Sequence, residues 1–439
     1  MRRYVLIGGG VASMAALEAI RHADPSGEVL LIGDEAYGYY SRPGLAYYLT
    51  GELPEDFLFP MKNQEFHNLN ARRLRAKAVR IHPDRHTVQL QDGRLVPYDR
   101  LLMAVGAEAQ MSKVPGIELD GVIKLDSLDD ARNILQKARR GRRAVVVGGG
   151  ITALEIVEGL VARRVHTQYF LRGDRYWTNV LDETEAHIVE ERLREEGVRI
   201  HYRTELEAIL GTGGRVTGVR TKDGRTIPCD LVGIAIGIRP RLGLAQTAGL
   251  QVERGVTVSE TMQTSARDVF AAGDIAQVYD PHTGKSTLDS LWGPAREQGY
   301  AAGLNMAGIT RAYYKPVAFN VTRLANLTTT IIGTVGRGED SDVTGIVRGD
   351  SETWRQLPDA IAAQSGFDIN RLRLLVGKDT LLGAIVMGDQ TLSRPLQHLI
   401  TQGADITPIR QQLLRPGAAL VDLLADFWTA WKDKVAVPA

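Results

Sequence analysis

The chain contains one strand-turn-helix pattern twice, and this repeat limits its fold more than any other feature. The first copy is the apolar run Tyr4–Ile7 followed by three glycines from Gly8 to Gly10, and the second is Ala144–Val147 followed by Gly148 to Gly150. Each triplet passes directly into an apolar helical pattern, which is the context of a dinucleotide-binding turn. A single such cluster could be a tight turn without a ligand. Two copies in one chain predict two dinucleotide sites.

The glycines have separate tasks in this interpretation. Gly8 permits a turn where a Cβ would clash, and Gly10 lets backbone N–H groups approach a pyrophosphate at the positive end of a helix. The third fingerprint position, where helix and strand pack closely, carries Ser13 in the first copy and Ala153 in the second. Ala153 suits that position, whereas Ser13 adds a hydroxyl that could reach a phosphate.

The residues after the second strand of each unit indicate how each ribose is held. In the first unit the strand Glu28–Ile32 is followed by Asp34, our first choice for the ribose acceptor, and Glu35, our second. In the second unit the expected strand Thr167–Leu171 is followed by Arg172, with Arg175 a short turn away. A guanidinium pairs well with a 2′-phosphate, so this end favours NADPH, unless both arginines are solvated surface charges.

Later segments indicate three domains. The apolar strand that ends at Gly273 and Asp274 returns the chain to its first domain, and a helix follows with Pro294 in its first turn. We predict an α/β protein with two Rossmann-like domains, the first discontinuous and the second inserted, and a C-terminal α+β interface domain. The expected boundaries are 1–117 and 240–315 for the first domain, 118–239 for the second and 316–439 for the third.

Composition narrows the function classes. The 439 residues carry a formal net charge of +1, which argues against a nucleic-acid partner. No apolar run is long enough to cross a membrane, and a cytoplasmic location is expected. Cys229 is the only cysteine, which excludes an internal redox disulfide, a four-cysteine cluster and a cysteine-rich zinc site. Cys229 itself is expected to be a buried structural thiol.

The C-terminal segment has an apolar and aromatic stripe at helical spacing. Its members are Leu420, Val421, Leu424, Phe427, Trp428 and Trp431. We expect this stripe to pack within the protein or against another subunit, with a dimer contact or a membrane-surface contact as the alternatives.

Along nearly all its length the chain resembles the pyridine nucleotide-disulfide oxidoreductase superfamily, and within it the ferredoxin, rubredoxin and nitrite reductase type. The resemblance implies FAD in the first domain and NADPH or NADH in the second. It also implies that Asp274 holds the ribityl and pyrophosphate part of FAD, that Arg42 contacts its phosphates, and that Trp292 and Glu155 lie near the flavin or nicotinamide.

The full set of site residues combines both lines of inference. The residues expected at FAD are Gly8, Gly10, Ser13, Asp34, Glu35, Arg42, Pro43, Ala104, Gly106, Gly273, Asp274, Trp292 and Ala295. The residues expected at NAD(P)H are Gly148, Gly150, Ala153, Glu155, Arg172, Arg175 and Gly237. No catalytic side chain is assigned with certainty, because the flavin supplies the chemistry, and no metal is expected.

Three departures from the family pattern affect the chemistry. Pro43 stands about where some relatives have a redox cysteine, so thiol chemistry is not available. Tyr47 replaces a lysine common in the family, and Val105 replaces the threonine of an Ala-Thr-Gly strand end. The replacement at Tyr47 puts a flavin–lysine contact in doubt.

The predicted function is that of an FAD-dependent NAD(P)H:acceptor oxidoreductase. A hydride passes from NAD(P)H to FAD, and electrons then pass to an external acceptor such as a ferredoxin, a rubredoxin or a partner reductase subunit. Two alternatives stay open at this point. One is a quinone or oxygen reductase, and the other is a redox-responsive flavin-binding interaction protein resembling apoptosis-inducing factor. A homodimer is also considered.

Overall fold

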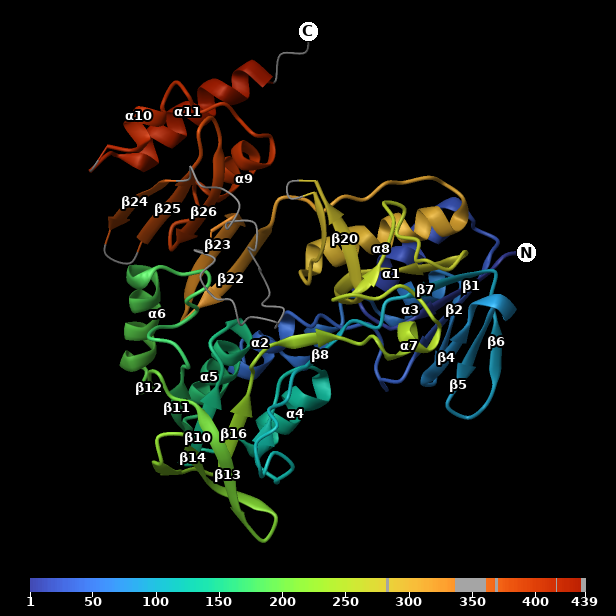
Figure 1. The fold of residues 1–439 in the computed structure, drawn as a ribbon, viewed down its shortest axis with the longest axis horizontal. Helices are drawn as coiled ribbons and strands as arrows, with labels where there is room; N and C mark the ends of the chain where they lie inside the picture. The colour runs from blue at the N-terminus through green and yellow to red at the C-terminus, as the bar shows by residue number, and fades with distance from the viewer. Residues whose placement is uncertain (282–283, 336–360, 368–369, 416, 436–439) are drawn as a thin grey trace.

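The structure is a computed structural model that describes residues 1–281, 284–335, 361–367, 370–415 and 417–435 (Figure 1). The described chain has three parts, each built around one five-stranded sheet. The sheet of the first part is parallel, with the strand order β19-β7-β1-β2-β3. Its strands are β1 (Arg3–Ile7), β2 (Glu28–Gly33), β3 (Ala71–Arg75), β7 (Arg100–Met103) and β19 (Val269–Ala271). β19 lies beside β7, from which it is separated by the whole second unit. The chain therefore returns to its first sheet, as predicted.

Two helices pack against each other beside this sheet, α1 (Val11–Ala23) and α8 (Trp292–Ala307). They approach closely because two positions of α8 lack a side chain. A Cβ at Gly299 would lie 2.0 Å from the carbonyl oxygen of Ala12, and one at Gly303 would lie 2.4 Å from that of Ala16. The start of α8 is thereby held beside the first glycine turn.

Smaller elements complete the first part. They are β4 (Ala78–His82), β5 (Thr87–Leu90), β6 (Leu95–Pro97), β18 (Val256–Thr257), β20 (Ala276–Asp280), β21 (Lys285–Leu288), α2 (Gly44–Thr50), α3 (Asn63–Asn68) and α7 (Gly243–Thr247). β4, β5 and β6 form an antiparallel meander, whereas β3 joins the parallel sheet.

A second five-stranded parallel sheet has the order β12-β11-β10-β16-β9. Its strands are β9 (Val122–Ile123), β10 (Arg143–Val147), β11 (His166–Phe170), β12 (Arg199–His201) and β16 (Leu231–Ile234), and its helices are α4 (Leu128–Lys137), α5 (Ile151–Ala162) and α6 (Glu183–Glu195). An antiparallel flap adjoins it, formed by β13 (Leu206–Thr212), β14 (Arg215–Thr221) and β15 (Thr226–Pro228). β11 begins and ends one residue earlier than expected.

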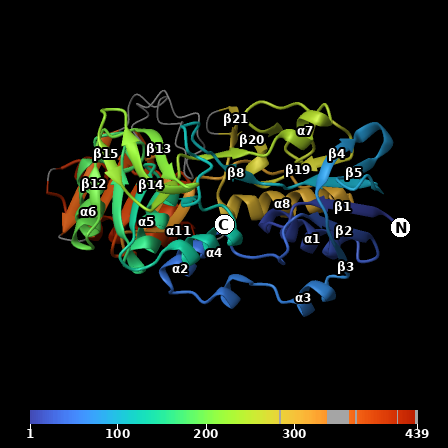
Figure 2. The same cartoon turned by 90° about the horizontal axis from the view of Figure 1, so that it is seen from below.

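Two antiparallel segments connect the first and second parts, β8 (Ala107–Ala109) and β17 (Ile238–Pro240). Figure 2 shows the two parts from below, with the N-terminus at the far end of the first. The outgoing and returning chain thus form one two-stranded ribbon. Helix α5 also contacts α2 across this junction, where a Cβ at Gly159 would lie 2.8 Å from that of Leu49.

The third part has an antiparallel sheet in the order β22-β23-β26-β25-β24 and lies beside the second part (Figure 1). Its elements are β22 (Phe319–Leu324), β23 (Leu327–Gly333), β24 (Ile361–Phe367), β25 (Asn370–Val376), β26 (Leu381–Met387), α9 (Ser393–Thr401), α10 (Arg410–Leu413) and α11 (Leu420–Val435). Residues 336–360, 368–369, 416 and 436–439 of the predicted third domain lie outside the described residues.

The aromatic stripe of α11 packs partly within the protein. Leu420 and Leu424 are buried in the core of the third part, and the ring of Trp428 lies 5.4 Å from that of His398 on α9 and 5.5 Å from that of Trp431. Among the described residues, no helix combines the length and the apolar character needed to span a bilayer.

Candidate functional site

The two glycine turns have the same geometry. Gly8 and Gly148 both have positive φ, +111° and +146°. A Cβ at Gly8 would lie 2.1 Å from the carbonyl oxygen of Ala104, and one at Gly148 would lie 2.0 Å from that of Ala235. Each of these carbonyls follows the strand that pairs with the fingerprint strand. The first position of each turn therefore requires glycine for the same reason: the end of a neighbouring strand leaves no room for a side chain.

Both turns are built to receive a phosphate group. Helices α1 and α5 begin after Gly10 and Gly150 without a side-chain cap, so their first N–H groups and positive dipole ends are available to an anion. A Cβ at Gly10 or Gly150 would have no heavy atom within 4 Å, which leaves room beside the backbone. Ser13 is fully buried, and its Oγ has no hydrogen-bond partner in the described structure. These features fit a dinucleotide at each turn.

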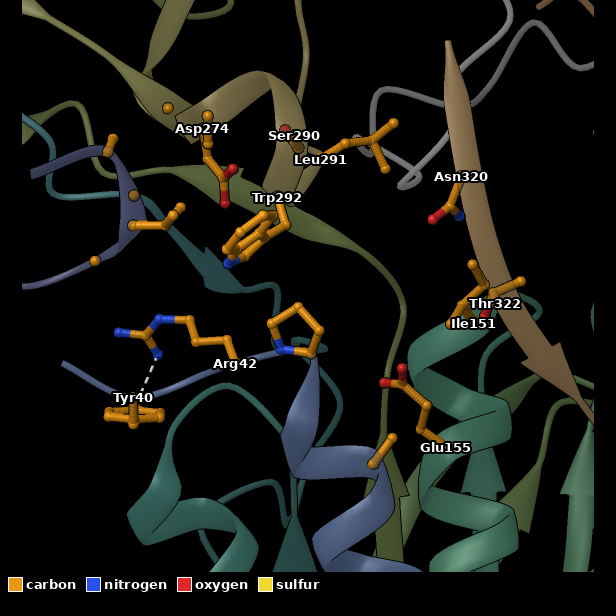
Figure 3. Close-up of a pocket in the computed structure, with 18 of the residues that line it drawn as sticks. Tyr40, Arg42, Ile151, Glu155, Asp274, Ser290, Leu291, Trp292, Asn320 and Thr322 are labelled. Carbon is orange, nitrogen blue, oxygen red and sulfur yellow. Dashed lines mark hydrogen bonds between the residues drawn. The ribbon is translucent and has the colours of Figure 1, made fainter. Parts of the chain in front are cut away.

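A single pocket brings together residues from all three parts of the chain (Figure 3). Ten of the predicted site residues line it: Gly10, Arg42, Pro43, Ala104, Gly106, Glu155, Gly273, Asp274, Trp292 and Ala295. Trp292 and Asp274 lie on one side, while Glu155 on α5 faces them across the pocket. Trp292 is 46% exposed. The flat apolar indole of Trp292 and the carboxylate of Glu155 thus line the same pocket as the beginnings of α1 and α5.

The other predicted residues lie outside the lining of this pocket. They are Gly8, Ser13, Asp34, Glu35, Gly148, Gly150, Ala153, Arg172, Arg175 and Gly237. The glycines, Ser13 and Ala153 form the two turns or the strand end next to them. Asp34 is exposed and Glu35 is half-buried just beyond β2. The pocket is therefore the centre of the candidate site. The other predicted residues belong either to the first glycine turn and the end of β2 or to the second glycine turn and the strand ends beside it.

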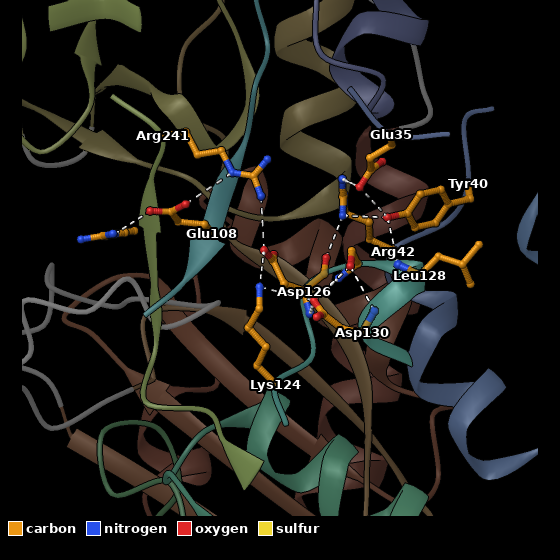
Figure 4. A network of polar contacts seen from close by, with 11 residues as sticks. Glu35, Tyr40, Arg42, Glu108, Lys124, Asp126, Leu128, Asp130 and Arg241 are labelled. Atoms are coloured by element: carbon orange, nitrogen blue, oxygen red, sulfur yellow. Dashed lines mark hydrogen bonds and ion pairs between the residues drawn. The ribbon is translucent and has the colours of Figure 1, made fainter. Parts of the chain in front are cut away.

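Arg42 belongs to a polar network between the first and second parts (Figure 4). It donates to the Tyr40 hydroxyl at 3.0 Å, to the Asp126 carbonyl at 2.7 Å and to Glu35 Oε1 at 3.2 Å. Tyr40 is 4% exposed, and burial raises the pKa of its phenol well above the ordinary value. Arg42 thus lines the pocket and also connects the β2 side of the first sheet to the second part.

The strand end after β19 forms the opposite wall. Gly273 has φ +77°, and its N–H donates to Oε1 of Gln298 on α8 at 2.8 Å. Gln298 is fully buried, and its Nε2 has no hydrogen-bond partner in the described structure. This turn directs the carboxylate of Asp274 into the pocket, as Figure 3 shows. A carboxylate in this position can accept hydrogen bonds from a polyhydroxyl chain.

The strand end after β11 carries the two predicted arginines. Arg172 is exposed, and Arg175 is half-buried and lies 3.0 Å from the Asp174 carboxylate. Gly148 N–H donates to the Phe170 carbonyl at 3.3 Å, so this strand end lies directly beside the second glycine turn. Arg172 therefore follows a strand end that lies beside the second glycine turn, while Asp174 partly neutralises Arg175.

Sequence reasoning missed several residues that line the pocket. Among them are Glu158 on α5, one turn beyond Glu155, and Asn320, Val321, Thr322 and Arg323 of β22. Burial raises the pKa of Glu158 to about 7, the largest effect, and nearby Glu155 adds to it while Arg323 opposes it. The i, i+3 spacing of Glu155 and Glu158 was a visible signal, since such residues share a helix face. The approach of β22 had no sequence signal.

The lone thiol is not part of the pocket. Cys229 is fully buried in the second part, and burial raises the pKa of its thiol to about 12. It therefore stays protonated and has the structural character that its surroundings predicted. Among the described residues, no three His, Cys, Asp or Glu side chains are grouped so that they could hold a metal ion.

Comparisons with known proteins agree with this geometry. Residues 2–299 match the family model described as pyridine nucleotide-disulphide oxidoreductase. The NADH-dependent phenylglyoxylate dehydrogenase subunit epsilon of Aromatoleum evansii is 27% identical, over 97% of this chain and 98% of the relative. The ferredoxin–NAD(+) reductase component of the biphenyl dioxygenase system of Paraburkholderia xenovorans is 31% identical, over 85% and 87%.

A solved structure shows the same fold. The covalent putidaredoxin reductase–putidaredoxin complex contains a chain that superposes with a TM-score of 0.84 at 23% identity, covering 97% of this chain and 98% of the other.

Proposed function

Because the chain belongs to the pyridine nucleotide-disulphide oxidoreductase family and is an FAD-dependent NAD(P)H oxidoreductase, we propose that its electron partner is a small iron–sulfur protein or an iron–sulfur subunit of a larger enzyme. The observation that carries the proposal is the pocket that joins both glycine helices but contains no thiol. Cys229 lies elsewhere and is the only cysteine, so electrons have no protein relay and must pass directly to an external acceptor.

The residues that would hold FAD surround the first turn. Gly8, Gly10 and Ser13 would receive the pyrophosphate at the start of α1, and Asp274 would bind the ribityl hydroxyls. When bound, FAD accepts a hydride from the nicotinamide and releases its electrons to the acceptor. The uncapped start of α8, beginning at Trp292, contributes positive potential on this side of the pocket. Arg42 would contact a phosphate by exchanging its bond to Glu35.

The second turn would hold the nicotinamide nucleotide. Gly148, Gly150 and Ala153 lie at the start of α5, which places Glu155 in the pocket. The names of the relatives support NADH, whereas Arg172 supports the NADPH predicted from the sequence. We propose that the chain uses both, because Arg172 stands where a carboxylate would receive the ribose 2′-hydroxyl, and a guanidinium attracts a 2′-phosphate. Arg175 pairs with Asp174 at the same strand end.

Two features of the relatives support the choice of partner. One relative is named as a ferredoxin reductase, and another, which matches over nearly its whole length, is named as a subunit of an NADH-dependent dehydrogenase. The latter suggests a role as the nicotinamide-linked subunit of a larger enzyme. In that setting the same pocket would work toward reduction of NAD(P)⁺ as well as oxidation of NAD(P)H.

The three-domain division also belongs to the proposal. The two parallel sheets and the antiparallel third sheet support boundaries at 1–117 with 240–315, at 118–239 and at 316–439. A cytoplasmic location and a homodimer stay predictions.

The test is a stopped-flow acceptor screen. The holoenzyme is reduced anaerobically with NADH or NADPH and then mixed with a ferredoxin, a rubredoxin, a quinone or oxygen. We expect flavin reoxidation to be fastest with an iron–sulfur protein. Faster reoxidation by the quinone or by oxygen would overturn the proposed partner. Failure of either nucleotide to bleach the flavin would overturn the assignment of the second turn.

A further inference from the structure

Glu158 occupies a position between the pocket and the protein surface. It lines the pocket one helical turn from Glu155. On its other side, Glu158 Oε1 accepts a hydrogen bond from the backbone N–H of Asn326 at 3.3 Å. Asn326 is exposed at the turn between β22 and β23. One carboxylate therefore connects the interior of the pocket with a solvent-exposed turn of the third part.

The charged groups around Glu158 act in opposite directions on the ionisation of its carboxylate. Arg323 of β22 attracts the ionised carboxylate, while Glu155 on α5 and Glu196 after α6 oppose its ionisation. Arg323 is itself engaged, since its Nη2 donates to Glu52 Oε1 at 2.6 Å and its guanidinium lies 5.0 Å from the centre of the Tyr47 ring. Its Nε has no hydrogen-bond partner in the described structure, so Arg323 has donor capacity left for Glu158.

The proposed reaction leaves one proton to be removed. With a one-electron acceptor, NAD(P)H plus two oxidised acceptors give NAD(P)⁺, two reduced acceptors and one H⁺. The two electrons leave through the acceptor, so the proton must leave the pocket by another group. In the reverse direction the same proton must enter.

We propose that Glu158 carries this proton between the pocket and the solvent at the β22–β23 turn. The carboxylate takes up H⁺ on the pocket side to become the neutral acid, and it returns to the carboxylate when the proton passes to water beside Asn326. The inference rests on the proposed function for the source of the proton. Burial, which raises the pKa of Glu158 to about 7, supports it, because such a group exchanges protons in both directions near neutral pH.

Two variants distinguish the loss of the Glu158 carboxylate from the loss of a carboxylate elsewhere on the protein. Glu158→Gln keeps the shape of the side chain but cannot ionise. The matched control is Glu195→Gln, which removes a carboxylate from the exposed end of α6. If Glu158→Gln does not fold, Glu158→Asp keeps an ionisable group with a shorter reach.

The first measurement does not depend on turnover. Infrared difference spectra of the protein are recorded from about pH 5 to about pH 9. We expect a buried carboxylic acid band that disappears near neutral pH in the wild type and in Glu195→Gln, and that is missing in Glu158→Gln. A spectrum in which the Glu158→Gln protein keeps this band would overturn the proposal.

The second measurement compares the rate of proton release with the rate of electron transfer. Stopped-flow mixing of the holoenzyme with NADH and ferricyanide, an inorganic one-electron acceptor, is followed with a pH indicator. In Glu158→Gln we expect proton release to lag electron transfer by about tenfold or more, and added acetate to restore it. In the Glu195→Gln control, flavin reduction by NADH and proton release should both keep their wild-type rates. Proton release in step with electron transfer in Glu158→Gln would overturn the proposal.

Ferricyanide also separates the two proposals. If a partner screen fails to favour iron–sulfur proteins, proton release to ferricyanide still tests Glu158, because every one-electron acceptor leaves the same proton behind.

Discussion

The guanidinium of Arg373 on β25 donates to Glu185 Oε1 on α6 at 2.8 Å, and both residues are buried. Glu185 also belongs to the capping box of α6, in which its N–H donates to Asp182 and its carboxylate accepts from the Asp182 N–H. Arg371 donates to Asp182 Oδ2 at 2.7 Å. A helix start in the second part is thus locked to a strand of the third part.

Removing Arg373 should be far more costly than removing an exposed arginine. Arg373→Met leaves the Glu185 carboxylate buried without its main partner, and we expect a loss of about 3 to 5 kcal/mol in the free energy of unfolding. Arg220→Met, which breaks an exposed ion pair with Glu207, should cost less than about 1 kcal/mol. Denaturant unfolding of both variants measures the difference. Equal losses would contradict the interpretation of Arg373 as an interdomain clamp.

Gly299 should tolerate no side chain. In Gly299→Ala the new Cβ meets the Ala12 carbonyl, so α8 must move away from α1, and we expect a loss of about 1 to 3 kcal/mol or more. Gly293→Ala in the same helix is the control, because a Cβ there meets no atom within 4 Å. Thermal unfolding of the apoproteins compares the two. A melting temperature of Gly299→Ala equal to that of the control would show that the helices can separate without cost.

Asp274→Ala should reduce FAD occupancy. The variant removes the carboxylate that points into the pocket, and losing a hydrogen bond to a charged group should weaken FAD binding by about tenfold or more. Flavin absorbance per protein and the dissociation constant of FAD after reconstitution measure the effect. Asp274→Asn keeps part of the hydrogen-bonding capacity and should lie between. A fully yellow Asp274→Ala protein would show that the site is misplaced.

Arg172→Glu should change the choice of nucleotide. A carboxylate repels a 2′-phosphate, so we expect the ratio of kcat/KM for NADPH to that for NADH to fall by about tenfold or more. Arg199→Glu is the control, because this exposed residue begins β12, the strand beside β11, and so lies at the other end of these parallel strands from Arg172. Steady-state kinetics with both nucleotides give the ratios. If Arg172→Glu affects both nucleotides equally, Arg172 does not contact a 2′-phosphate.

Cys229 should be unreactive in the folded protein. With its pKa raised to about 12 by burial, almost no thiolate is present at neutral pH, so a disulfide reagent should label no thiol until the protein is unfolded. One thiol should then react. Cys229→Ala should keep the rate of flavin reduction by NADH. Rapid labelling of the native protein together with loss of that rate would place a thiol in the chemistry.

Local sequence determined the two dinucleotide units. The apolar strand, the glycine turn and the amphipathic helix are adjacent along the chain, and their backbone requirements are local, so Gly8 to Gly10 and Gly148 to Gly150 could be recognised directly. The start of α8 with Pro294 in its first turn and the lone thiol of Cys229 were predictable for the same reason.

The tertiary structure decided how the pocket is closed. Glu158 and Arg323 are 165 positions apart in numbering, and nothing in either segment predicts that β22 and α5 line the same pocket. Their electrostatic character also depends on the fold, because burial and the charges of other elements raise the pKa of Glu158. Glycine turns are specified by backbone geometry within a few residues. The raised pKa of Glu158 depends on packing between segments that are far apart in the chain, which partly shields its carboxylate from water.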